Sequence, residues 1–385
     1  MNSNARKLVA LTIIAGACLN GVLRCMAAST TEANEATAMM SSYEKEMTDA
    51  DAARVKDPAW KPTCAELGVI QVGDAKHPGA LRNFCLNAEG NILACYAAAE
   101  DSKSSVAKNP SGLRVLSPKG ELLKTFPLEI KPTAVCVAKD GSIFVAGDGK
   151  LLKLDAAGKV LAEAASPVAN EPVVITKETE NMVEEMAKQT KKPVKDELER
   201  MKKNLEKRRA DVTGVAVTEQ DVFMAVPSPS DFSFRVYRFD LALQSPKLVV
   251  DKLRGCCSQM DIQSHDGKLL IPHNARHTVE AHDRDGKELS KFGKAGRVKA
   301  ADFGGCCEPK NLRVLANGDI LAAESGPPTC IKRFSASGKF LGVVASVPNA
   351  KGDCVRVTVE VSPDGTRYYM LDTTRDAIRI FGAKS

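Results

Sequence analysis

Aromatic residues are scarce in this chain of 385 residues: they make up 5% of the sequence, with a single tryptophan. An excess of one charge is also lacking, because 54 basic and 48 acidic residues leave a formal net charge of only +6. Proteins that bind single-stranded nucleic acid combine a basic groove with stacking aromatic side chains. The composition offers neither, so no nucleic-acid partner is predicted.

Long hydrophobic runs are lacking too. The apolar run Leu8–Ala17 is well short of the roughly 20 residues that a transmembrane helix needs, and no later segment qualifies. Arg6 and Lys7 precede this run and Ala27-Ala28 follow it, which is the pattern of a signal peptide over residues 1–28. We therefore expect export to the periplasm or the cell exterior. Residues around Cys18 resemble a lipobox, which makes a lipid anchor there the alternative.

Familiar catalytic motifs are also missing: there is no nucleophile elbow, no phosphate-cradling glycine loop and no haem-attachment Cys-x-x-Cys-His. Cysteine, in contrast, is plentiful, with twelve in the chain. The ten after the leader are Cys64, Cys85, Cys95, Cys136, Cys256, Cys257, Cys306, Cys307, Cys330 and Cys354. An even set of cysteines in an exported chain indicates disulfides first.

Turn signals recur at a regular interval from about residue 62 onward. Six markers each lie between two apolar runs, namely Glu89-Gly90, Asp140-Gly141, Glu219-Gln220, Asp266-Gly267, Asn317-Gly318 and Asp364-Gly365. They are 47–51 residues apart except for one interval of 79. A second glycine turn recurs within most repeats, so each repeat contains four short strands. Such a unit has the size of one blade of a β-propeller.

A family resemblance is clear in four of the repeats. Asp140-Gly-Ser-Ile-Phe-Val-Ala in one and Asn317-Gly-Asp-Ile-Leu-Ala-Ala in another resemble NHL-repeat propellers. The resemblance covers residues 62–385 outside the long interval and implies an all-β, six-bladed propeller. The NHL family includes binding scaffolds as well as lyase- and hydrolase-like enzymes, so the resemblance does not fix a function.

The long interval contains a helical insertion. Residues 171–210 are rich in Glu, Lys and Met, and Pro193 divides the pattern in two. The stripe of Val194, Leu198, Met201 and Leu205 predicts an amphipathic second helix. We expect a helical hairpin between blades two and three. Its charged face is either solvated or a partner-binding surface, and a polar linker over residues 29–61 precedes the propeller.

Closure of the ring can also be predicted. The last repeat ends at Ala377–Phe381, its third strand, and an orphan strand at Gly68–Val72 precedes the first repeat. If this orphan strand pairs with the strand of Ile378, it completes the last blade and removes an exposed edge.

One position near the predicted channel mouth is occupied by cysteine in three consecutive blades. Cys256, Cys307 and Cys354 each lie 11 residues before the turn glycine of their repeat. In a propeller, the loop leading into the innermost strand shares a face with the loop between the second and third strands. The binding residues predicted on this rim are Cys256, Cys257, His273, His277, Cys306, Cys307, Glu324, Cys330, Cys354 and Asp372.

Three interpretations of this cysteine rim stay open. Inter-blade disulfides fit an oxidising compartment, and adjacent cysteines are poorly spaced to pair with each other. Thiolates with His273 or His277 suit zinc or copper, although no cofactor is required. Redox-active thiols are the third interpretation. His265 and His282 lie beside turns and are expected to be solvated.

Two classes of function follow from these patterns. The favoured one is a non-enzymatic binding scaffold for a protein or a cell-envelope component. The alternative is a metal-dependent lyase or hydrolase at the channel mouth of blades four to six, with Glu324, Asp372, His273 and His277 as its candidate groups.

Overall fold

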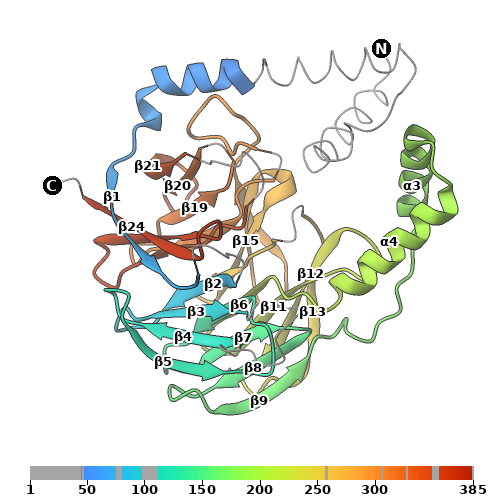
Figure 1. The fold of residues 1–385 in the computed structure, drawn as a ribbon, viewed down its shortest axis with the longest axis horizontal. Helices are drawn as coiled ribbons and strands as arrows, with labels where there is room; N and C mark the ends of the chain where they lie inside the picture. The colour runs from blue at the N-terminus through green and yellow to red at the C-terminus, as the bar shows by residue number, and fades with distance from the viewer. Residues whose placement is uncertain are drawn as a thin grey trace.

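The protein is a six-bladed β-propeller (Figure 1). Its structure is a computed structural model that describes residues 45, 47–74, 80–97, 111–255, 259–305, 307–326, 328–348 and 355–383. Six separate antiparallel sheets of four strands each form the blades, as the repeat count predicts.

The strands of each blade run outward from the propeller axis in chain order, except that the outermost strand of blade six comes from the start of the propeller. Blade one consists of β2 (Leu81–Leu86), β3 (Ile92–Tyr96), β4 (Gly112–Leu116) and β5 (Leu122–Pro127). Blade two consists of β6 (Ala134–Val137), β7 (Ile143–Gly147), β8 (Lys150–Leu154) and β9 (Val160–Ala165). Blade three consists of β10 (Gly214–Val217), β11 (Asp221–Pro227), β12 (Ser233–Asp240) and β13 (Lys247–Arg254).

Blades four to six continue the order. Blade four consists of β14 (Gln263–His265), β15 (Lys268–His273), β16 (Thr278–His282) and β17 (Glu288–Phe292). Blade five consists of β18 (Asn311–Val314), β19 (Ile320–Glu324), β20 (Thr329–Phe334) and β21 (Phe340–Val347). Blade six consists of β22 (Val359–Val361), β23 (Arg367–Asp372), β24 (Ala377–Ala383) and β1 (Cys64–Gln71).

Helices lie between or beside the blades. The predicted hairpin consists of α3 (Lys177–Thr190) and α4 (Val194–Arg208), between β9 and β10. A helix over residues 47–56 and the 3-10 turns η2 (Pro58–Trp60) and η3 (Asn274–Arg276) complete the set among the described residues. Within that part of the chain, no helix is both long and apolar enough to cross a membrane.

Glycine turns shape most of the blades. In blade five, Gly318 (φ +83°) joins β18 to β19 and Gly338 (φ +83°) joins β20 to β21. A side chain disfavours this left-handed backbone, whereas glycine accepts it at little cost. Blade three makes its first turn through Thr218–Gln220 without glycine, where the hydroxyl of Thr218 accepts hydrogen bonds from the N–H groups of Gln220 and Asp221.

The apolar core lies between blades rather than within them. Six clusters of buried side chains each combine residues from two neighbouring blades. Phe144 of blade two packs with Met224 of blade three, for example, and Leu321 of blade five packs with Met370 of blade six. Each blade therefore depends on both neighbours for burial of its faces, as repeat architectures do.

A ring of hydrogen bonds joins the innermost strands around the axis. Asn83 donates to the Thr133 carbonyl, Thr133 to that of Val212, and Ser264 to that of Val217. Asn311 then links blade five to blade four through Asp261, and to blade six through the N–H of Val359. Thr358 closes the circle by donating to Asn83 (2.8 Å). All six junctions between blades are thus bridged near the axis.

The closing strand is the one that the sequence predicts. β1 pairs antiparallel with β24 over its whole length, and Ile70 lies opposite Ile378. Ile70 is buried among residues of blades six and one, and it also touches Gly120 in a turn of blade one. The first segment of the propeller therefore joins its last blade and seals the junction with blade one.

Shortening the closing side chain should weaken the whole ring. Ile70→Ala is expected to lower the free energy of unfolding by about 3 kcal/mol, because it removes buried methyl groups and leaves a cavity. Val69→Ala, one residue away and 44% exposed, should change it by less than about 0.5 kcal/mol. Urea unfolding midpoints of the two variants test this, and equal midpoints would contradict the role given to β1.

Candidate functional site

The predicted rim is best described in blade five. The loop leading into β18 and the connection between β19 and β20 meet at one end of this blade, as propeller geometry requires. The first loop supplies Gly304, Gly305 and 307–310, and the second supplies Glu324, Ser325 and Gly326. We call this group, together with Lys332, the blade-five rim.

A buried carboxyl group joins the two loops. Oε1 of Glu308 accepts hydrogen bonds from the N–H of Ser325 (3.0 Å), its hydroxyl (2.7 Å) and the N–H of Gly326 (3.0 Å). Oε2 has no hydrogen-bond partner among the described residues. Burial raises the pKa of Glu308 to about 8, although the positive charge of Lys310 opposes this shift.

A second buried pair lies deeper in the same rim. Lys332 is fully buried and forms an ion pair with Glu324, and its ammonium also donates to the Asp302 carbonyl (2.6 Å). The other oxygen of Glu324 accepts from the N–H of Gly304 (2.8 Å). A buried charge must be paired and hydrogen-bonded to be tolerated, and these contacts meet that requirement.

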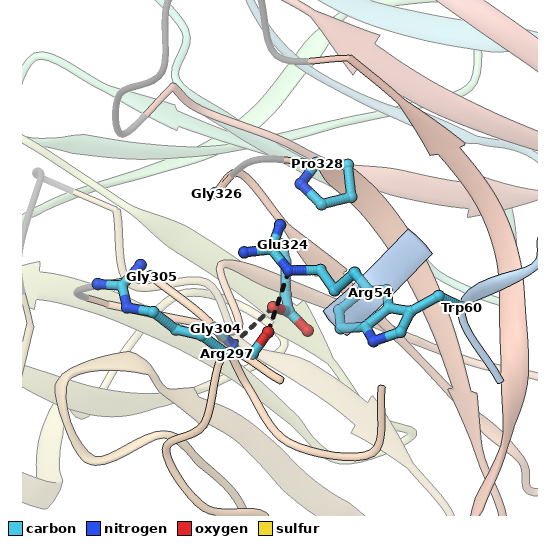
Figure 2. Close-up of a pocket in the computed structure, with 8 residues that line it drawn as sticks. All are labelled: Arg54, Trp60, Arg297, Gly304, Gly305, Glu324, Gly326 and Pro328. Carbon is cyan, nitrogen blue, oxygen red and sulfur yellow. Dashed lines mark hydrogen bonds between the residues drawn. The ribbon is translucent and has the colours of Figure 1, made fainter. Parts of the chain in front are cut away.

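The segment before β1 covers this pair. The ring of Trp60 lies 4.7 Å from the Lys332 ammonium, and its Nε1 donates to the Val298 carbonyl (2.8 Å). Arg54 lies beside Trp60 and donates to the Arg297 carbonyl (3.0 Å) (Figure 2). The cavity enclosed here is about 10 Å³, room for about one water molecule. The described part of the predicted linker is thus docked on blade five.

A thiol and an amine meet in the leading loop. Nζ of Lys310 lies 2.7 Å from Sγ of Cys307, and both residues are fully buried. Cys307 is not in a disulfide, and Cys64, Cys85, Cys95, Cys136 and Cys330 are free thiols. Cys256, Cys257, Cys306 and Cys354 lie outside the described residues, so predicted inter-blade disulfides through them stay a prediction.

The predicted histidines are held by blade four rather than presented at the channel. Nδ1 of His273 pairs with Glu280 (2.8 Å) and its Nε2 accepts from the N–H of Arg254. His282 contacts the other oxygen of Glu280 (3.3 Å) and is buried, so the prediction that it is solvated was wrong. Burial opposes ionisation of Glu280, but its two histidine partners hold its pKa well below the ordinary range. His277 reaches across to the Gly305 carbonyl (3.4 Å).

The remaining predicted residues are also engaged. Asp372 accepts from the hydroxyl of Thr374 (2.5 Å) and binds Arg379 (2.8 Å), which anchors the turn between β23 and β24. Cys330 lies in a small apolar cluster, and burial raises the pKa of its thiol well above the ordinary value. The structure brings Glu324 and Cys307 into the blade-five rim, whereas His273 and Asp372 stabilise their own blades.

The part of the chain that the structure describes contains no preformed set of metal ligands. No group of three or more His, Cys, Asp or Glu residues there is arranged to hold a metal ion. The zinc or copper interpretation of the rim therefore depends on cysteines outside the described residues.

Sequence reasoning missed a groove on the outer side of blades five and six. Its volume is about 300 Å³, and it is lined by Thr63, Arg333, Leu341, Gly342, Val344 and Tyr368. Leu341 is 48% exposed on the outermost strand of its blade. The available signal was Gly342, because glycine inside a strand often marks a β-bulge, and the register between β20 and β21 shifts beside it.

Comparison with known proteins supports the fold alone. No protein-family model and no curated protein sequence matches the chain, so membership of the NHL-repeat family stays a prediction. A solved protein of unknown function from Bacteroides thetaiotaomicron is similar with a TM-score of 0.53 and 12% identity, over 84% of this chain and 78% of that one. A streptogramin B lyase (TM-score 0.48, 11% identity, 82% and 97% covered) and the Pan2 WD40 domain of Neurospora crassa (0.48, 9%, 84% and 97%) are further matches.

The elevated pKa of Glu308 gives stability a specific pH dependence. The folded protein holds this proton up to about pH 8, whereas the unfolded chain releases it near 4.5. Stability should therefore fall as pH rises through this window, by at most about 1.4 kcal/mol per pH unit. Glu308→Gln keeps an acceptor for Ser325 but cannot ionise, so its stability relative to wild type should increase across the same window.

Unfolding free energies at several pH values, measured with reductant present, provide the test. Glu219→Gln is the matched control, because Lys139 holds the pKa of this exposed carboxyl below its ordinary value and it stays ionised throughout the window. A difference between wild type and Glu308→Gln that does not vary with pH would contradict the buried, neutral state of Glu308.

Proposed function

We propose that this protein is an exported, non-enzymatic interaction scaffold whose ring holds the α3–α4 hairpin out as a docking arm for a protein partner. The observation that carries the proposal is the construction of that arm. Val183, Met201 and Leu205 form a small apolar core between the two helices, separate from the six cores of the ring. The hairpin stands clear of the propeller (Figure 1). It therefore exposes a large surface on a folded element.

The arm is fixed at its base rather than tethered loosely. Arg209, at the end of α4, donates to the Glu171 carbonyl (2.6 Å), and Glu171 forms an ion pair with Arg235 of blade three (2.9 Å). The guanidinium of Arg208 lies over the rings of Phe232 and Phe234. Contacts of this kind are worth about 0.5–2 kcal/mol each. Together they favour a fixed orientation, which lowers the entropic cost of binding a partner.

Charge on the arm is divided between its helices. α3 carries four Glu and two Lys, whereas α4 carries six Lys or Arg and four Asp or Glu. Thr176 caps α3 by accepting from the N–H of Thr179, and the basic residues of α4 gather toward its C-terminal end. A surface of this composition suits a partner with charged groups of both signs, and its binding should weaken with added salt.

The arm shares a face with the predicted cysteine rim. It is inserted in the connection from β9 to β10, on the side of the ring where the leading loops lie. Arg254, at the end of β13, lies 3.9 Å from Glu178 of α3, and the predicted rim residues Cys256 and Cys257 follow directly in the chain. On this proposal a partner docked on the arm also covers the rim.

Photo-crosslinking residues at exposed positions of the hairpin should identify a direct partner. We expect a discrete adduct from crosslinkers at Lys195 and Asn204 in cells, and none from one at Leu161, which is also exposed but lies on the outer strand β9. Lys202→Glu with Lys203→Glu should reduce the adduct about tenfold, the effect of losing about 1.4 kcal/mol of binding. Equal labelling from the hairpin and from Leu161 would overturn the proposal.

Export has its own test. The mature protein should begin at Ser29, because cleavage is expected after Ala28. Ile13→Arg breaks the apolar run and should leave uncleaved precursor in the cytosol, whereas Asn4→Lys only adds to the basic start and should be processed normally. N-terminal sequencing of cell fractions measures this. Full-length wild-type chain in the cytosol, with Met1 retained, would count against export.

A further inference from the structure

The sulfur of Cys307 and the side-chain nitrogen of Lys310 lie closer together than a hydrogen bond between them requires. The 2.7 Å between Sγ and Nζ is shorter than the van der Waals separation of nitrogen and sulfur. Both side chains are fully buried, and the backbone N–H of Lys310 is fixed by the Ala323 carbonyl (2.8 Å). The two atoms are therefore held together by the surrounding blade.

The repeat in blade four shows how unusual this lysine is. Gly255-Cys-Cys and Gly305-Cys-Cys begin equivalent loops, and the residue three positions after the second cysteine is Met260 in one and Lys310 in the other. Met260 is fully buried in the apolar core between blades three and four. Lys310 brings a charge to the equivalent place, where desolvation of the ammonium group is unfavourable unless it is paired.

The pair has the chemistry of an activated thiol. A neighbouring ammonium group stabilises the thiolate, which is the form of cysteine that oxidants attack. Once its sulfur is oxidised, the nearest amine is the one already in contact with it. A nitrogen nucleophile beside an oxidised cysteine sulfur can capture it before further oxidation occurs.

We propose that Cys307 and Lys310 form a covalent oxidative cross-link, in which one oxygen atom bridges Sγ and Nζ. The reaction consumes one dioxygen molecule: of the three hydrogens of the ammonium ion, one stays on nitrogen in the bridge and two are lost. The N–O and O–S bonds form, one oxygen atom enters the bridge, and the other leaves as water with two of the hydrogens. Sulfur and nitrogen together supply the four electrons that reduce dioxygen.

A bridge with one oxygen fits the site better than a direct nitrogen–sulfur bond. An inserted oxygen spans a gap of the observed size with both backbones in place, whereas a direct bond would pull the two atoms much closer together. The small cavity beside Gly304 and Gly305 lies at the same loop. Dioxygen is small and apolar enough to reach a site of this kind.

The cross-link would change the distribution of charge in the blade-five rim. It converts the thiolate and the ammonium group into one neutral linkage, which removes the positive charge of Lys310 that favours ionised Glu308. The bridge joins residues only three apart, so it gains little from loop closure. Its effect is therefore the redox-dependent replacement of a buried charged pair by a neutral linkage next to a buried carboxyl group.

Peptide mass spectrometry of the full-length protein tests this inference. After exposure to air, trypsin should fail to cut at Lys310 and should release the peptide 300–313, with a mass increased by one oxygen and reduced by two hydrogens. Dithiothreitol should restore the thiol and the cleavage at Lys310. Cys307→Ser and Lys310→Met should each abolish the modified peptide, and Lys310→Met copies the side chain of the blade-four repeat.

Cys330 is the matched control within the same chain, because it is equally buried in the same blade. Its peptide should keep an unmodified thiol under the same exposure. The inference is overturned if Cys307 of aerated protein is recovered as a thiol, in a disulfide with any cysteine, or as a sulfinic acid with Lys310 cleavable. A mass change that persists in Lys310→Met would also overturn it.

Discussion

Six innermost strands approach a common axis without pairing with one another, because each belongs to a separate sheet. Their inward polar groups must therefore find partners across the gaps between blades. Side chains such as Asn83 and Asn311 provide these bridges, and the amide of Gln259 extends them by binding both the carbonyl (2.8 Å) and the N–H (3.3 Å) of Val357. The relative position of every blade depends on this ring of hydrogen bonds.

This ring of hydrogen bonds also explains why charged side chains are buried around the axis. Asp261 is almost fully shielded from solvent, and burial raises its pKa to about 6 even though Arg313 and Arg356 lie near it. The Asn311 amide binds this carboxyl group directly. Arg313 of β18 also forms an ion pair with the buried Glu360 of β22, so blades five and six are joined by paired charges as well as by apolar contacts.

The blade count and the closing strand could be predicted from the sequence because they depend on local signals. Turn glycines require a particular backbone, and a missing fourth strand in the last repeat leaves one place for Gly68–Val72. The stripe of Met201 and Leu205 likewise predicted the buried side of α4, since helical periodicity reports which side chains pack.

The rim was harder to predict, because buried charges are recognised only through partners that are distant in the sequence. Lys310 and Lys332 look like surface residues until Cys307 and Glu324 are placed beside them. His282 was expected to be solvated because it precedes a turn, but it is buried and pairs with Glu280. Nothing in the polar composition of residues 29–61 indicated that Trp60 would cover the Lys332 ammonium.

The position of β1 has a consequence for the order of folding. Glu66 and Arg379, which pair across the seam, are 313 residues apart in the chain, and contacts of such long range are formed slowly. During synthesis β1 emerges first and must wait for β24, which emerges last. Throughout that interval its backbone edge and the apolar side chain of Ile70 lack their native partners, and such segments are prone to aggregate.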